Sequence, residues 1–254
     1  MTDQLAVVSD IHGNVRALDA VVVEIERRRI ETIVNLGDCF YGPFDPRPVA
    51  DRLLSEGWAT VAGNEDRCLT LPLGPATSRT ARFTRERLTL AHLDWLSKLP
   101  DVRRIGERIV AFHGRPDDNA AYLLSRSDGR GGVRRATNEE VRAALRGIRS
   151  PLILCGHDHL PRVVRLEDDR TIVNPGSVGC PAYTEDHPVP HAVENRTPHA
   201  RFAIVTIDGE SVRAESIRVD YDWNRAATEA KANGFPDWAT WIATGRVFPL
   251  EQTS

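Results

Sequence analysis

The stretch Ile33-Val34-Asn35-Leu36-Gly37-Asp38 is an apolar run that closes with a glycine and a single carboxylate. A short run rich in β-branched residues predicts a buried strand in a mostly parallel sheet. Ligands of such sheets bind beyond the carboxyl ends of the strands. Taken alone, an aspartate after a strand more often caps a helix or starts a turn. The role of Asp38 therefore depends on what the rest of the chain brings to the same edge.

Six other side chains with nitrogen or oxygen donors follow apolar runs in the same manner. They are Asp10 and His12 after residues 5–9, Asn64 after 58–62, His113 after 108–112, and His157 and His159 after 152–156. Considered separately, each has an ordinary structural explanation, such as a helix cap or an Asx turn. Together with Asp38 they provide enough ligands for two metal ions that share one residue. We expect Asp38 to be the shared ligand.

The composition favours one domain that binds a small ligand. The chain has 254 residues and a net charge of −3, and α/β folds of this length commonly form one domain. We expect a single domain over residues 1–254, with a helical tail from about residue 222. The net charge gives no attraction to nucleic acid. Any phosphate must then be held locally, by metal ions and a few arginines.

The cysteines and the N-terminal residues favour a cytoplasmic protein. The four cysteines show no CxxC spacing, which is typical of free thiols in a reducing compartment. Residues 1–4 lead into the first strand without a basic leader, and there is no long apolar segment, so no membrane partner is expected. Cys39 adjoins a candidate ligand, but a packing role is favoured because a thiolate is softer than the other donors. The sequence does not predict the oligomeric state.

Strand and helix signals alternate along the first half of the chain and turn to antiparallel strands after Pro161. Strands are expected at 5–9, 32–36, 58–62, 102–105, 108–112, 152–156, 162–166, 171–173, 201–207 and 211–219. Helices are expected at 15–25, near 46–55, within 68–100, after the capping box at Thr137, and at 223–231 and 237–244.

Two segments are expected to be loops. Residues 181–200 contain four prolines and three histidines, and the irregular spacing favours a surface or lid loop over a third metal site. Residues 126–135 contain four arginines and three glycines. A solvated basic loop is favoured there, and a contact between Arg126 and a substrate phosphate is the alternative.

The chain resembles the calcineurin-like metallophosphoesterase superfamily in five ordered motifs: Asp10-Ile11-His12, Gly37-Asp38, Gly63-Asn64, His113-Gly114 and Gly156-His157-Asp158-His159. Residues 38–43, residues 174–179 and the tail from Tyr221 resemble its bacterial and archaeal single-domain branch. The resemblance implies a four-layer α/β/β/α sandwich of two mixed sheets flanked by helices, with two metal ions at the sheet edge. It also implies the ligand sets: Asp10, His12, Asp38 and His159 for one ion, and Asp38, Asn64, His113 and His157 for the other.

One position departs from the superfamily pattern. Many relatives carry histidine directly after the asparagine, where it stabilises the transition state or protonates the leaving oxygen. Here Glu65 and Asp66 follow Asn64. The branch often lacks this histidine, so activity is still expected, and Glu65 or Asp66 can act as the acid if a neighbouring carboxylate raises its pKa. The candidate catalytic residues are thus Asp38, Asn64, Glu65 and Asp66.

The implied activity is hydrolysis of a phosphoester. Two divalent ions lower the pKa of a shared water, bind the phosphoryl oxygens and stabilise in-line attack by the resulting hydroxide. The donor types suit Mn²⁺, Fe, Zn²⁺ or Ni²⁺ and do not distinguish among them. The expected substrate is a small soluble phosphodiester, nucleotide or dinucleoside polyphosphate. Tyr41 and Phe44 offer ring faces for a base, unless these aromatics pack their loop onto the body of the protein.

Two alternative functions remain. One is a catalytically weak metal-binding scaffold, as in the retromer subunit that keeps this fold, and the presence of all seven ligand types argues against it. The other is a nuclease, which neither the net charge nor an aromatic and basic groove supports.

Overall fold

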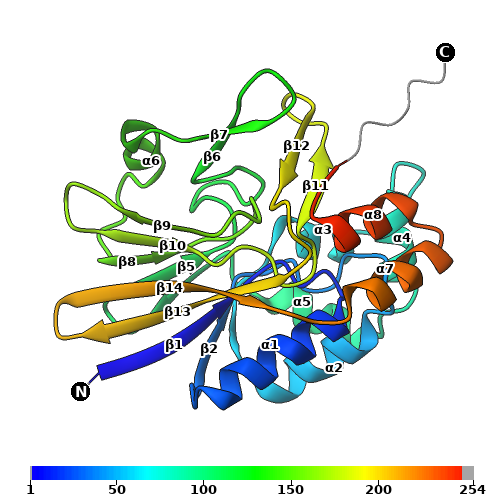
Figure 1. Cartoon of the computed structure of the whole chain (residues 1–254), viewed down its shortest axis with the longest axis horizontal. Helices are drawn as coiled ribbons and strands as arrows, with labels where there is room; N and C mark the ends of the chain where they lie inside the picture. The colour runs from blue at the N-terminus through cyan, green and yellow to red at the C-terminus, as the bar shows by residue number, and fades with distance from the viewer. Residues whose placement is uncertain (1, 248–254) are drawn as a thin grey trace.

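Two five-stranded mixed sheets form the centre of the protein (Figure 1). The computed structural model describes residues 2–247. The first sheet has the order β14 (Ser211–Val219), β13 (Ala200–Asp208), β1 (Thr2–Val8), β2 (Thr32–Asn35), β3 (Ala59–Thr60). The second has the order β4 (Val102–Ile105), β5 (Ile109–Phe112), β8 (Leu152–Leu154), β10 (Thr171–Asn174), β9 (Arg162–Arg165). β1, β2 and β3 are parallel, as are β5, β8 and β10, while the remaining strands pair antiparallel.

The sheets pack face to face, and the side chains of β1 show why its sequence is apolar throughout. Leu5 and Val7 lie in the core between the sheets, whereas Ala6 and Val8 lie in the core beneath the helices. Successive side chains of a strand point to opposite faces, so a strand covered on both sides needs an unbroken apolar run. Parallel strands covered on both faces therefore present their carboxyl ends as the part of the sheet free to bind a ligand.

Helices cover the outer faces of both sheets (Figure 1). α1 (Val15–Arg27), α2 (Arg47–Glu56) and α5 (Leu90–Lys98) pack on the first sheet, and α6 (Asn138–Ala144) packs on the second. The short helix α3 (Asn64–Thr70) lies beside α5 and beside α4 (Arg79–Arg85). The expected fold class, two mixed sheets flanked by helices, is confirmed. The strand predicted at 58–62 is shorter than expected because Ala62 donates its N–H to Pro100 (2.9 Å) instead of to the sheet.

Two C-terminal helices pack on each other beside the strand ends (Figure 1). α7 (Trp223–Ala232) and α8 (Pro236–Thr244) agree with the helices predicted at 223–231 and 237–244. They share a core with Phe44 and Cys180. Residues 248–254 of the predicted helical tail lie outside the described residues. No helix between residues 2 and 247 is long and apolar enough to cross a membrane.

The prediction of loops at 181–200 and 126–135 is wrong, because both segments contain β-hairpins. β11 (Ala182–Glu185) pairs with β12 (His191–Glu194), and β6 (Ser125–Ser127) pairs with β7 (Val133–Arg135). Pro188 and Pro190 lie in the connection between β11 and β12, where they remove no ladder hydrogen bond. The hairpins also support each other, since the N–H of Ala192 donates to the carbonyl of Gly131 (2.9 Å).

Candidate metal centre

The seven predicted ligand residues meet at the carboxyl ends of parallel strands from both sheets. Asp10 and His12 follow β1, Asp38 follows β2, Asn64 begins α3, His113 follows β5, and His157 and His159 follow β8. Donor atoms of Asp10, His12 and Asp38 lie within 4.8 Å of one another, and so do those of Asp38, His113 and His157. Asp38 thus belongs to both groups.

The backbone at these residues adopts a conformation that most side chains avoid. Asp10, His12, Asp38, His157 and His159 have φ between 51° and 69°, and they are five of the eight non-glycine residues with positive φ in the described part of the chain. Such residues cost free energy and cluster at functional sites. The loops after β1 and β2 hold each other in this conformation, because Asp10 N–H donates to Gly37 (2.9 Å) and His12 N–H to Asp38 (3.0 Å).

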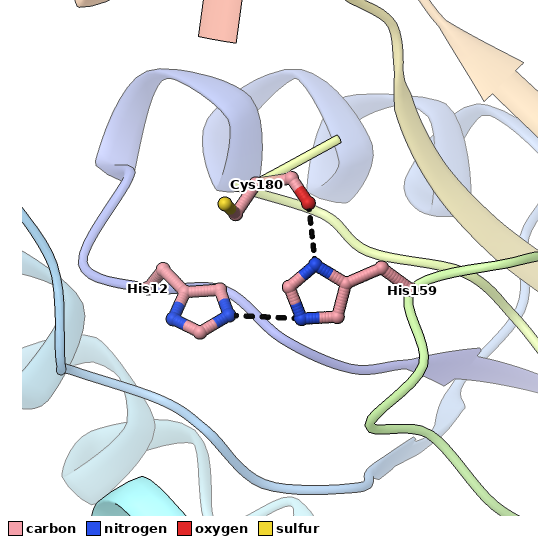
Figure 2. A group of neighbouring side chains, drawn as sticks. All are labelled: His12, His159 and Cys180. Carbon is pink, nitrogen blue, oxygen red and sulfur yellow. Dashed lines mark hydrogen bonds between the residues drawn. The ribbon is translucent and has the colours of Figure 1, made fainter. Parts of the chain in front are cut away.

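Main-chain carbonyls orient all four candidate imidazole ligands; Nδ1 of His12 lies 2.8 Å from the carbonyl of Tyr41, and Nε2 of His157 lies 2.9 Å from that of Ala120. Nδ1 of His113 donates to the carbonyl of Leu36 (2.7 Å), and Nδ1 of His159 donates to that of Cys180 (2.6 Å; Figure 2). Their Nε2 atoms then face the carboxylates, at 3.2 Å from Asp38 for His113 and 3.2 Å from Asp10 for His159. A carbonyl on one ring nitrogen fixes the tautomer and leaves the other nitrogen for a metal.

Several donor atoms at the centre have no conventional hydrogen bond. Asp10 Oδ1, Asn64 Oδ1 and His113 Nε2 are buried and lack a hydrogen-bond partner within the described residues. Buried polar atoms are normally satisfied, so unsatisfied oxygens and nitrogens on three candidate ligands require an explanation. A divalent cation fits this donor set, which combines imidazole nitrogens, carboxylates and an amide oxygen.

The pKa shifts of the buried side chains at the centre also favour a bound cation. Burial would lower the pKa of His113, but Asp38 raises it to about 10. Burial would likewise lower the pKa of His12, but Glu65 and then Asp38 raise it to about 9. The pKa of Asp38 is held below its ordinary value, because His113 outweighs the effect of burial. Buried carboxylates are stabilised here by nearby positive charge, which a metal ion supplies.

Comparison with known proteins decides the family. Residues 4–195 match the calcineurin-like phosphoesterase superfamily domain. The chain belongs to this superfamily. It is a hydrolase that acts on phosphoester bonds, and its family depends on metal ions.

This phosphoesterase is similar to individual proteins over nearly its whole length. It is 24% identical to the uncharacterized protein MJ0912 of Methanocaldococcus jannaschii, over 92% of this chain and 94% of that protein. It superimposes on a metallophosphoesterase from Sphaerobacter thermophilus with a TM-score of 0.77, 24% identity and coverage of 97% and 100% of the two chains. For the hypothetical protein PH1004 from Pyrococcus horikoshii the TM-score is 0.71, at 20% identity and coverage of 96% and 99%. These structures establish the fold.

Five of the seven candidate ligands of the phosphoesterase line a cavity of about 230 Å³: His12, Asp38, Asn64, His157 and His159. Its other walls are Tyr41, Glu65, Thr80, Cys180, Tyr183, Thr184, Glu185, Trp238 and Trp241. Trp238 packs edge-on against His12. The ring of Tyr183 packs against His159 at a tilt. The sequence pattern predicts α8 but not the place of its two tryptophans in the cavity wall. A spacing of three residues puts both on one helix face, which is the signal that could have indicated this.

Asp66 does not lie where the expected general acid would be; its carboxylate binds the main chain instead. Its Oδ1 accepts from Cys39 N–H (2.9 Å), and its Oδ2 accepts from Asp38 N–H (2.8 Å) and Gly63 N–H (3.0 Å). The side chain is fully buried and does not line the cavity. The three backbone donors hold Asp66 away from the cavity, where it supports the loop that carries Asp38.

Glu65 lines the cavity directly after the candidate ligand Asn64. Its Oε2 lies 3.3 Å from His12 Nδ1. Burial, together with the negative charge of Asp38, raises the pKa of Glu65 to about 7. Of the two candidate acids, the structure brings only this one to the cavity.

Two of the three expected substrate contacts are not brought to the cavity. Phe44 is 3% exposed and packs among α7 and α8, so its ring has no free face. Arg126 Nη1 donates to the carbonyls of Tyr122 (2.7 Å) and Ser125 (2.6 Å), which ties it to its own hairpin. Tyr41 does line the cavity. The other aromatic walls come from β11 and α8.

Two cysteines lie close to the centre. Cys39 is buried and accepts a hydrogen bond from Asn35 Nδ2 (3.2 Å), which agrees with the expected packing role. Cys180 lines the cavity beside His12 and His159 (Figure 2). Its thiol donates to the carbonyl of Ala182 (3.1 Å), and burial raises its pKa well above the ordinary value. Cys180 is therefore a neutral thiol that packs against the histidines.

Proposed function

We propose that this phosphoesterase hydrolyses a small soluble phosphoester that carries an aromatic group, in the class of nucleotides, and that it does so with two divalent ions. The observation that carries the proposal is the sharing of Asp38 between two groups of donors at the base of an aromatic-walled cavity. The first ion would be held by Asp10, His12, Asp38 and His159, and the second by Asp38, Asn64, His113 and His157.

The protein fixes these donors before any ion or substrate arrives. The positive φ of five ligand residues and the carbonyl contacts of His113 and His159 set the directions of the donor atoms. When bound, two ions would activate water and neutralise the charge that develops on the phosphoryl oxygens. Rigid support of this kind matters because small displacements of ligands cost metal affinity and activity.

Glu65 is the proposed proton donor to the leaving oxygen. Its side chain lines the cavity, and burial together with the negative charge of Asp38 raises its pKa above that of an ordinary glutamate. A general acid works best when its pKa lies near the working pH. Glu65 thereby takes over the task that a histidine performs in many relatives.

The cavity favours an aromatic substrate group. Trp241 is half-buried at the wall of the cavity, and Tyr41 and Tyr183 also line it. Nucleobases stack on such rings with little dependence on base identity. Thr184 and Glu185 add hydrogen-bonding groups to the same wall. A cavity of about 230 Å³ suits a small molecule better than a folded phosphoprotein.

The test begins with metal analysis of the purified protein. The protein is then stripped with a chelator, and turnover is measured with each of Mn²⁺, Fe²⁺, Zn²⁺ and Ni²⁺ restored. The substrates are chromogenic phosphoesters, nucleotides, dinucleoside polyphosphates, phosphopeptides and RNA. We expect metal-dependent turnover that is fastest for a small aromatic phosphoester. Faster turnover of phosphopeptides or RNA would overturn the substrate class, and equal turnover without metal would overturn the mechanism.

A further inference from the structure

A second cavity adjoins the metal centre. It has a volume of about 540 Å³ and shares Tyr41, Asn64 and Glu65 with the metal cavity. Its remaining lining comes from the end of α3, the segment 71–77 and the start of α4: Cys68, Leu69, Leu71, Pro72, Leu73, Gly74, Pro75, Ala76, Thr77, Ser78, Ala81 and Arg85. We call this cavity the 71–77 groove. The groove begins beside Asn64, which is a candidate metal ligand.

The 71–77 groove has an apolar lining. Only Glu65 and Arg85 among its lining residues carry a charge. Leu71 and Leu73 are 61% and 40% exposed, which is unusual for large apolar side chains in this protein. Exposed leucines that gather around one depression, next to an active site, are typical of a surface that receives an apolar group.

The segment that forms the groove is held in place. The N–H of Gly74 donates to Thr77 Oγ1 (2.8 Å), Thr77 N–H donates back to the carbonyl of Gly74 (3.1 Å), and Arg82 donates to the same carbonyl (2.9 Å). Tyr41 and Ser78 share a hydrogen bond (2.9 Å) between their hydroxyls at the border of the two cavities. A groove fixed by such contacts costs little ordering when a ligand binds.

We propose that the 71–77 groove is a second substrate subsite, which takes an apolar aliphatic substituent of a phosphodiester. The inference rests on the proposed function, in which phosphorus lies at the metal centre. A diester extends two substituents from phosphorus, and two cavities meet beside Asn64 and Glu65. The aromatic substituent occupies the cavity beside Trp241, and the aliphatic one lies along Leu71 and Leu73.

The experiment uses p-nitrophenyl alkyl phosphodiesters with alkyl chains from methyl to hexyl, and the metal-loaded full chain. Burial of each methylene strengthens binding roughly three- to fourfold, so we expect kcat/KM to rise by about that factor per carbon until the groove is filled. Matching phosphinates, in which carbon replaces both bridging oxygens and no P–O ester bond is left to hydrolyse, are titrated by calorimetry and should show the same dependence in Kd. Leu71→Ser and Leu73→Ser should flatten both dependences.

The matched control is Leu90→Ser. Leu90 is 86% exposed and lines neither cavity, so its substitution should leave the dependence on chain length unchanged. No dependence on chain length in the parent protein, or an equal loss in the Leu90 variant, would overturn the subsite. Failure to hydrolyse any phosphoester would overturn the proposed function. In that case the phosphinate titration still decides whether the groove binds the alkyl chain.

Discussion

Asp38 is the residue on which the two-ion assignment depends, because only its carboxylate belongs to both donor groups. We expect Asp38→Ala to lose most of both ions, and activity to fall by at least about 100-fold, since even supporting contacts of metal ligands are worth roughly 10- to 100-fold. His159→Ala should mainly lose one ion and His157→Ala the other. Elemental analysis of the three purified variants measures this. Loss of the same single ion in all three would contradict the shared role.

Glu65 is predicted to protonate the leaving oxygen. In the parent protein the rate should depend weakly on the acidity of the leaving group, and Glu65→Gln should make that dependence steep, because water must then supply the proton. A series of aryl phosphoesters with graded leaving groups measures the slope. If the parent already shows a steep slope that Glu65→Gln does not change, no acid operates and the assignment fails.

Asp66 is predicted to affect stability through the three backbone N–H groups that it accepts. Asp66→Asn places an amide donor among these donors, and the free energy of unfolding should fall by about 1–3 kcal/mol, the cost of leaving buried groups unpaired. Urea unfolding of the metal-free protein measures the change. The slope of the leaving-group series should stay as in the parent, which distinguishes Asp66 from Glu65.

At the scale of elements, the strand ends could be predicted from sequence and the walls of the cavity could not. Apolar runs closed by glycine mark buried strands, so the positions of Asp38 and His157 followed from local pattern. β11 and β12 are short strands supported by the neighbouring hairpin, as in the bond from Ala192 N–H to the carbonyl of Gly131 in the turn between β6 and β7. The loop after Asp38 predicts a free ring face at Phe44. In the structure, α7 and α8, which come from the C-terminal part of the chain, cover this ring. Local pattern carries no information about such long-range packing.

Helix α8 is predicted to determine the preference for an aromatic substrate. Trp241→Ala should weaken nucleotide binding roughly tenfold or more, since one stacked base is worth about 1–3 kcal/mol. Trp241→Phe should restore most of the affinity, because a ring face remains. Calorimetric titration with a nucleotide product measures Kd, and elemental analysis checks that metal content is unchanged. Equal Kd for the alanine variant and the parent would exclude stacking on α8.

At the scale of the whole molecule, the metal centre joins the two sheets. Its ligands follow β1 and β2 on one sheet and β5 and β8 on the other, and β14 and β9 lie at outer edges of the two sheets. Removal of metal leaves buried carboxylates balanced only by protonated histidines such as His113. A ligand that binds only the folded state adds about 2.7 kcal/mol when present at 100 times its Kd. The loaded protein should therefore melt several degrees above the chelated protein.

The segments in which hydrogen exchange increases distinguish the loss of bound metal from a general stabilisation of the protein by salt. Hydrogen exchange of the chelated protein should increase in the loops that carry Asp10, Asp38 and His157, because their positive-φ conformations lose the ion that holds the side chains together. Exchange in β14 should remain close to that of the loaded protein, since its pairing with β13 does not involve the centre. Mass spectrometry of peptic fragments resolves these segments. No increase of exchange in these loops, together with no shift in melting temperature, would show that the sheets are held together by their shared apolar core alone.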